Sequence, residues 1–269
     1  MTRAILLKSA RESWWMVLMA VAAILLFETL FCRAMVSVAD SLPNILSNRP
    51  ALQYFIRMLV GSDIGDVITP TALVTIGFAH PFLLAVTWGL LLTICSRSPA
   101  GDVERGTADL LYALPASRLR IYSLTTLHWI LIAVILSLAP WVGITIGNRV
   151  VGFWEPIELD RFWLPTLNLF VLMVAVGCLA GMMSTLMSRR GFAIGVTLAI
   201  LLMSFLIDAL AFFWEGLRAV NVFGIMRYYQ PLVSVRTGQW PVTNFVVLGS
   251  VAVVLWTAGA VAISRRDMT

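Results

Sequence analysis

Charged residues are scarce in this chain of 269 residues. Lysine, arginine, aspartate and glutamate together make up 12% of the sequence, about half the share that is usual in soluble domains. Hydrophobic residues make up 60%, and the mean hydropathy is +0.91. This composition excludes an ordinary soluble globular domain and indicates that lipid is the solvent for most of the chain.

Residues that bind metals or form crosslinks are also few. The three cysteines, Cys32, Cys95 and Cys178, lie in or beside apolar runs, and their spacing matches neither a disulfide framework nor a metal site. We expect each to be a small buried hydrophobic residue. The two histidines, His80 and His128, occur in no zinc-binding pattern.

Only one lysine is present, Lys8, and no glycine precedes it. A phosphate-binding P-loop needs glycines followed by a lysine that reaches the phosphates, so this chain cannot bind ATP through a P-loop of its own. The serines of the apolar runs lack the Gly-x-Ser-x-Gly setting of a nucleophile. We therefore predict that the chain is not an enzyme and holds no cofactor.

Long apolar stretches define the predicted fold. A membrane-spanning helix needs roughly 20 apolar residues, and six stretches of that length lie at about 14–36, 71–95, 121–146, 163–187, 192–214 and 242–263. The first is too long for a cleaved signal peptide. The predicted fold is an all-α integral membrane protein, with an interfacial amphipathic helix at 1–13, a six-helix domain at 14–263 and a tail at 264–269.

The distribution of basic residues predicts the orientation, because cytoplasmic loops are enriched in lysine and arginine. Placing both termini in the cytoplasm puts the following residues on that side: Arg3, Lys8, Arg11, Arg97, Arg105, Arg118, Arg120, Arg189, Arg190, Arg265 and Arg266. The other arginines lie in longer segments that also contain acids. The net charge of +5 follows from this asymmetry, and we predict no nucleic-acid partner because the basic residues form no single patch.

Several of the predicted spans contain prolines or small residues. His80-Pro81 and Pro140 predict kinks, and His80 is expected to bond a carbonyl that its kink frees. The polar segment at 215–241 predicts short helices at the outer leaflet, with its tyrosines and tryptophan at headgroup depth. The fourth span has a small-residue face, which favours packing within the subunit or a subunit interface: Gly177, Ala180, Gly181 and Ser184.

Two carboxylates fall inside predicted spans, Glu28 in the first and Asp208 in the fifth. An ionisable group at mid-membrane costs roughly 2.5–3.5 kcal/mol on insertion scales. Each residue is therefore a candidate for lining a translocation path. The alternative is a satisfied hydrogen bond between helices.

The polar loop Glu104–Arg118 separates the second and third predicted spans. Gly106 and Thr107 favour a turn, and Thr107 is a candidate N-cap for a short helix beginning at Ala108. Asp109 would lie in its first turn, where the helix dipole favours a carboxylate. Ser117 is a candidate cap for the third span.

The middle of this loop is amphipathic. Leu110, Leu111 and Leu114 are spaced three and four residues apart and would form one apolar stripe, and Pro115 would end the helix. The pattern predicts a short helix at the membrane surface, positioned to contact another protein.

This loop closely resembles the cytoplasmic coupling loop of ABC-2-type transporter permeases. The similarity consists of an acidic residue followed by Gly-Thr, a second acidic position, paired leucines, proline and Ser-Arg. The N-terminal segment and the ending Ser264-Arg265-Arg266-Asp267 are also similar to that family. By length and loop sequence the chain looks most like the permeases linked to multicopper-enzyme maturation, although drug, lipid and peptide exporters share these features.

The resemblance implies an ATP-driven exporter of a bacterial or archaeal inner membrane. A separate ABC ATP-binding subunit would hold ATP and magnesium, and a second copy or a related permease would complete the membrane unit. The residues implied in coupling to the ATPase are Glu104, Arg105, Gly106, Thr107, Asp109, Leu110, Leu111, Leu114 and Pro115. The alternative is a non-transporting scaffold or signalling module that the same kind of ATPase drives.

Overall fold

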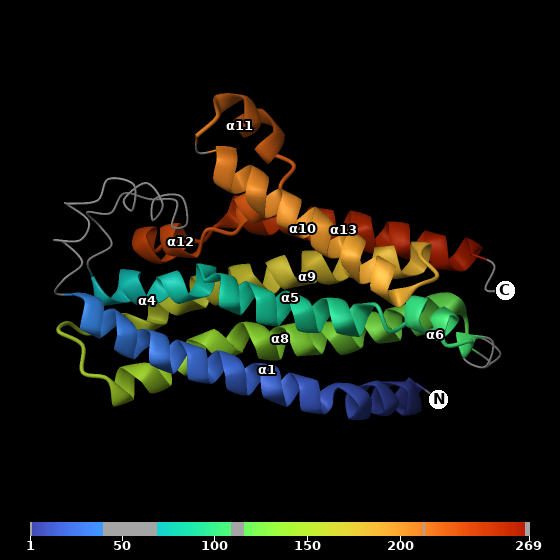
Figure 1. Ribbon diagram of the computed structural model, residues 1–269, viewed down its shortest axis with the longest axis horizontal. Helices are drawn as coiled ribbons and strands as arrows, with labels where there is room; N and C mark the ends of the chain where they lie inside the picture. The colour runs from blue at the N-terminus through green and yellow to red at the C-terminus, as the bar shows by residue number, and fades with distance from the viewer. Residues whose placement is uncertain (1, 40–68, 109–115, 212, 267–269) are drawn as a thin grey trace.

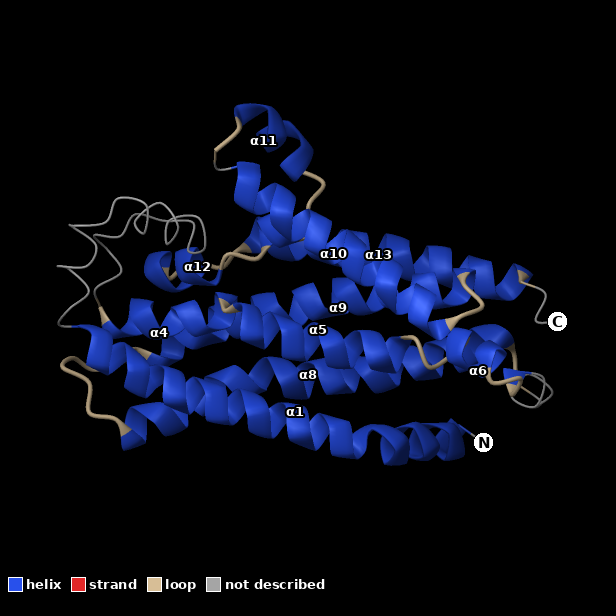
Figure 2. Ribbon diagram, in the orientation of Figure 1, coloured by secondary structure: helices blue, strands red, loops and turns tan. Residues whose placement is uncertain are grey.

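The computed structural model describes residues 2–39, 69–108, 116–211 and 213–266. Every regular element in these ranges is a helix, and none of them is a strand (Figure 1, Figure 2). The elements are α1 (Thr2–Ala39), α4 (Pro70–Ala79), α5 (Pro81–Cys95), α6 (Ala100–Glu104), α8 (Arg118–Val150), η2 (Leu159–Phe162), α9 (Trp163–Leu186), α10 (Arg190–Ala211), α11 (Glu215–Asn221), η3 (Met226–Tyr228), α12 (Pro231–Thr237) and α13 (Val242–Arg265).

Six helical stretches are long and apolar enough to cross a membrane. They are Leu6–Ser37, Pro70–Cys95, Arg118–Val150, Leu159–Leu186, Arg190–Ala211 and Val242–Arg265. The predicted all-α architecture with six such helices is therefore confirmed. Most of these helices extend past the predicted apolar limits because hydropathy marks only the lipid-matched part of a longer helix.

Helix α1 runs without interruption through 38 residues. No glycine or proline occurs between Thr2 and Ala39, so nothing in the sequence ends the helix early. At 1.5 Å per residue α1 is about 57 Å long, far longer than a hydrocarbon core of roughly 30 Å. The segment predicted as an interfacial helix, residues 1–13, supplies the first turns of α1, and its position at a membrane surface stays a prediction.

The second span is broken rather than kinked. Pro81 has no N–H to continue the helix, and its ring keeps the preceding residue extended; His80 accordingly has φ −67° and ψ 134°. Helix α4 ends there, and α5 begins with the His80 ring accepting a hydrogen bond from the Phe82 amide at 3.2 Å. By contrast, Pro140 lies inside the continuous helix α8.

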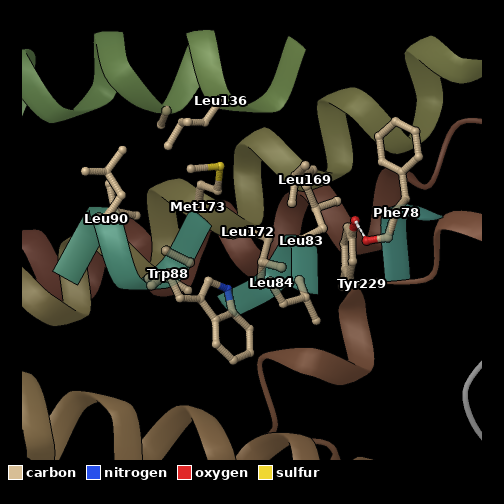
Figure 3. Close-up of a cluster of buried hydrophobic side chains, with 14 of the residues drawn as sticks. Phe78, Leu83, Leu84, Trp88, Leu90, Leu136, Leu169, Leu172, Met173 and Tyr229 are labelled. Atoms are coloured by element: carbon tan, nitrogen blue, oxygen red, sulfur yellow. Dashed lines mark hydrogen bonds between the residues drawn. The ribbon is translucent and has the colours of Figure 1, made fainter. Parts of the chain in front are cut away.

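Helix α9 forms the centre of the bundle. It packs against α5, α8, α10 and α13, while α1 packs chiefly on α8. The side chains of Leu169, Leu172 and Met173 are fully buried on α9 and meet residues of α5 and α8 in one apolar cluster (Figure 3). The outward faces of α1, α10 and α13 are apolar and exposed, as expected for helices that face lipid.

The bundle has two distinct ends. Both chain termini and α6 lie at one end, which we call the terminal end, whereas α12 lies toward the other (Figure 1). The short helices α11, η3 and α12 occupy the segment that was predicted to be too polar to span. Which end of the bundle faces the cytoplasm stays a prediction.

The small-residue face of the fourth span packs within the subunit. A Cβ atom at Gly177 would lie 2.5 Å from the ring of Trp129 on α8. Gly181 lies against the Tyr122 hydroxyl, and the Ser184 hydroxyl accepts a hydrogen bond from the Ala100 amide at 3.1 Å. These positions therefore serve contacts between α9 and its neighbours in the same chain.

We predict that Gly177→Ala lowers the melting temperature of the purified protein. Glycine-to-alanine within a helix gains roughly 0.5–1 kcal/mol, but the new methyl group must displace the Trp129 ring, and overpacking costs about 1–3 kcal/mol. Gly195→Ala on α10 is the matched control, because nothing lies within 4 Å of its Cβ position. A thermal scan in which Gly177→Ala is at least as stable as Gly195→Ala would contradict the prediction.

Candidate functional site

The loop after α5 closes into a short helix and a glycine turn at the terminal end. Asp102 lies in the first turn of α6 and forms an ion pair of 2.9 Å with Arg105. Gly106 has φ +65°, a conformation that favours glycine, and the next amide, of Thr107, donates to the Asp102 carbonyl at 2.9 Å. The predicted Gly-Thr turn is therefore present.

Part of the predicted coupling helix lies outside the described residues, namely Asp109, Leu110, Leu111, Leu114 and Pro115. The docking helix itself thus stays a prediction. Two flanking features are described. The Thr107 hydroxyl donates to the Asp102 carbonyl at 3.3 Å, and the Ser117 hydroxyl caps α8 by accepting from the Arg120 amide at 3.2 Å.

Glu104 joins this exposed loop to the start of α10. Residues Glu104 through Thr107 are all exposed, and the Glu104 carboxylate accepts a hydrogen bond from the Arg190 amide at 2.8 Å. A carboxylate at a helix N-terminus also interacts favourably with the helix dipole. Glu104 was expected to contact an outside protein, and the structure gives it this contact within the chain.

The Arg190 side chain runs beneath the loop and connects it to α5. Its Nε donates to the Ser96 hydroxyl at 3.3 Å, and its Nη2 donates to the Thr93 carbonyl at 2.9 Å. Gly101 leaves room for this path, because a Cβ there would lie only 3.4 Å from the arginine Cδ. Sequence reasoning used Arg190 only as an orientation signal and did not identify its role in holding the loop.

Further polar contacts connect the terminal end to α1 and α13. Arg97, just after α5, forms an ion pair with Glu12 at 3.3 Å and also donates to the Glu12 carbonyl at 3.2 Å. The Arg266 guanidinium, at the end of α13, donates to the Thr185 carbonyl at 2.6 Å and to the Ser188 hydroxyl at 2.8 Å. These contacts at the terminal end thus join α1 to α5, α10 to α5 and α13 to α9.

The two intramembrane carboxylates lie apart. Glu28 is on α1 and Asp208 is near the end of α10, and Figure 1 shows these two helices on opposite sides of the bundle. Asp208 is partly exposed and accepts a hydrogen bond of 2.7 Å from the Asn221 amide group on α11, which matches the hydrogen-bond alternative. Glu28 is fully buried, and neither of its oxygens has a hydrogen-bond partner among the described residues.

Tyr229 plays a part that the sequence did not indicate. It was expected at headgroup depth, but it is buried, and its hydroxyl donates to the Phe78 carbonyl at 2.8 Å (Figure 3). This carbonyl lies in the last turn of α4, and its usual helical donor, the Phe82 amide four residues on, bonds the His80 ring instead. His80 was expected to satisfy such a group; its ring instead caps α5. Burial raises the pKa of Tyr229 well above its usual value.

The described residues contain no group of three histidine, cysteine or acidic side chains that could hold a metal ion. The three cysteines are buried free thiols, as their apolar settings predicted. His128 lies 3.1 Å from the Ser13 hydroxyl, a contact that joins α8 to α1. The polar groups of the bundle therefore mainly connect helices.

Taken together, the fold is compatible with a multi-pass helical membrane protein that has a polar loop network at one end. Comparison with known proteins adds no closer assignment, because the chain matches no family model, no curated protein and no solved structure.

We predict that Arg190→Ala loosens the loop while Arg189→Ala does not. Arg189 is exposed, whereas alanine at 190 loses the bonds to Ser96 and Thr93, which we expect to destabilise the protein by about 1–2 kcal/mol. The measurement is hydrogen–deuterium exchange of residues 96–107 together with the melting temperature. Equal exchange rates in the two variants would show that Arg190 does not hold the loop.

We predict that Tyr229→Phe destabilises the protein more than Tyr228→Phe. The first change leaves the buried Phe78 carbonyl without its donor, at an expected cost of about 1–3 kcal/mol. The Tyr228 hydroxyl bonds the Val222 carbonyl at 2.8 Å near the surface, where water can replace it. Thermal unfolding of both variants tests the difference, and matching melting temperatures would contradict it.

Proposed function

We propose that the chain is the permease subunit of an ATP-driven ABC-2-type transporter, which couples ATP hydrolysis by a separate subunit to export across a membrane. The proposal takes its family from the resemblance of the Glu104–Arg118 loop. It takes its physical support from the way the described part of that loop is attached to the spans.

The observation that carries the proposal is the hydrogen bond between Glu104 and the first residue of α10. The carboxylate lies on an exposed loop, and its partner is the backbone of a spanning helix. A force applied to the loop would therefore act directly on α10, through Arg190 on α5, and through Arg97 on α1. A solvated loop without such attachments would not couple an outside motor to the spans.

The composition supports a separate motor. The chain has only Lys8 as lysine and lacks the P-loop glycines before it, so ATP binding of the P-loop type requires a second polypeptide. In this proposal ATP binding closes two such subunits, the loop at 104–116 moves, and the spans switch a pathway between two permeases. The terminal end then faces the cytoplasm.

The apolar outer faces support a paired permease embedded in lipid. On α1, α10 and α13 they include Leu26, Leu30, Leu202, Met203, Val253 and Val254, all more than half exposed. Because these side chains avoid water, lipid or a second permease covers them in the proposed assembly.

Co-purification from the native host tests the proposal. We expect the tagged chain to recover a P-loop ATPase, detected by photolabelling with an azido-ATP analogue and by mass spectrometry. The Asp109→Arg, Leu111→Arg double variant should recover on the order of tenfold less, because a charge reversal and a buried charge both weaken a docking interface.

The matched control is Glu155→Arg, which also replaces an acid by arginine. Glu155 is exposed and lies in the segment between α8 and η2, away from α6. It should recover as much ATPase as the unmodified chain. Absence of an ATPase from every preparation, or equal recovery from the double variant, would refute the proposal.

A further inference from the structure

Glu28 is enclosed by backbone on two sides. On α8, a Cβ atom at Gly143 would lie 2.7 Å from the Glu28 Cβ. On α4, the Glu28 carboxyl group lies so close to Gly77 that any Cβ there would overlap its oxygen atoms. The side chain is 0% exposed. Gly143 therefore makes room for the aliphatic part of the Glu28 side chain, and Gly77 makes room for its carboxyl group.

No cation approaches this carboxyl group in the described part of the chain. Helices α4 and α5 carry no charged residue. The nearest arginines along α1 and α8 are Arg33 and Arg149, and both are exposed. An ionised carboxylate without a partner is very unfavourable in an apolar interior, so the enclosed group requires a neutralising ligand.

The titratable neighbours do not supply one. Cys32, one turn further along α1, is an uncharged buried thiol beside Gly147, and the Tyr229 hydroxyl donates its proton to the Phe78 carbonyl. The His80 ring lies against Phe27, with ring centres 4.8 Å apart, and its Nδ1 already accepts from Phe82. On α8, Gly143 faces Glu28 and Gly147 faces Cys32, and neither glycine has a titratable side chain.

A metal cation does not fit this space. Such an ion takes about six oxygen ligands at more than 2 Å, whereas the Glu28 carboxyl group lies tightly against Gly77 and has no polar partner among the described residues. A proton needs one oxygen and no added volume. Both the need to neutralise the charge and the small space available therefore indicate that the ligand of Glu28 is a proton.

We infer that Glu28 is a proton-binding site that is occupied while α4 is closed against α1 and α8. Movement of α4 away from α1 admits water, and the carboxylic acid then releases its proton to that water and becomes a carboxylate. Tyr229 favours the closed arrangement, because its bond to the Phe78 carbonyl holds the end of α4. This inference does not depend on an ATPase partner.

Infrared spectroscopy of the full chain in lipid nanodiscs tests the site directly. The wild-type protein at neutral pH should show the carbonyl stretch of a protonated carboxylic acid, and Glu28→Gln should lose it. Asp208→Asn is the control and should keep the band, because Asp208 is partly exposed and hydrogen-bonded. Carboxylate bands that disappear in Glu28→Gln would show an ionised Glu28 and overturn the inference.

The pH dependence of the melting temperature is an independent test. It compares how each protein changes with pH, so a uniform loss of stability caused by the substitution does not affect it. At neutral pH an unfolded chain has released the Glu28 proton and the folded chain retains it, so the folded state binds one more proton. Stability contributed by this site must then fall as the pH rises. The melting temperature of the wild type should decline by several degrees from neutral to alkaline pH relative to Glu28→Gln, in which all other titratable groups are shared.

Replacing sodium in the buffer tests the remaining alternative, that Glu28 binds a metal cation instead of a proton. If replacing sodium by N-methylglucamine changes the melting temperature of the wild type but not of Glu28→Gln, the ligand is a metal cation and the inference is wrong. A parallel pH dependence in the two proteins would also overturn it. Gly77→Ala should weaken the wild-type pH dependence, because a methyl group at this position forces the carboxyl group out of its enclosure.

Discussion

The structure depends on one constraint, that backbone polar groups within an apolar bundle must find partners inside the protein. Continuous helices meet it automatically, and the His80-Pro81 break is where the chain departs from that rule. Two groups compensate there: the His80 ring caps α5, and the Tyr229 hydroxyl bonds the Phe78 carbonyl. Glu28 of α1 fills the space beside Gly77 but forms no hydrogen bond with the described residues. A local feature of two residues thus organises contacts among α1, α4, α5 and the segment before α12.

Backbone groups at the helix ends also need hydrogen-bond partners at the terminal end of the bundle. Water is available there, but residues of the loops supply some of these partners. Glu104 satisfies the first amide of α10, and Arg190 satisfies a carbonyl in the last turn of α5. Helix ends leave such groups unpaired by necessity, so a loop that supplies their partners becomes mechanically joined to the spans. In the proposed permease this is how a surface loop acts on helices that it does not belong to.

Several local features were readable from the sequence because neighbouring residues determine them. Gly106 adopts the positive φ of the expected turn, and Ser117 caps α8. The roles of Tyr229, Arg190 and Glu28 could not be read in this way, since each depends on partners that lie far away in the sequence. Asp208 and Glu28 looked alike in the sequence, and only their surroundings separate a hydrogen-bonded, partly exposed acid from an enclosed one.

Composition and hydropathy by themselves determined that this chain is all-helical, with six stretches able to cross a membrane, because lipid leaves an apolar chain few ways to satisfy its backbone. They also predicted a disturbance of the second span at Pro81, which has no N–H, but the kink that was expected there is a complete break. Tertiary structure alone decided which helix lies at the centre, which loop residues hold the spans, and which acid is sealed from water. Those outcomes depend on glycines meeting side chains across helices, and such contacts have no signature in the linear order of residues.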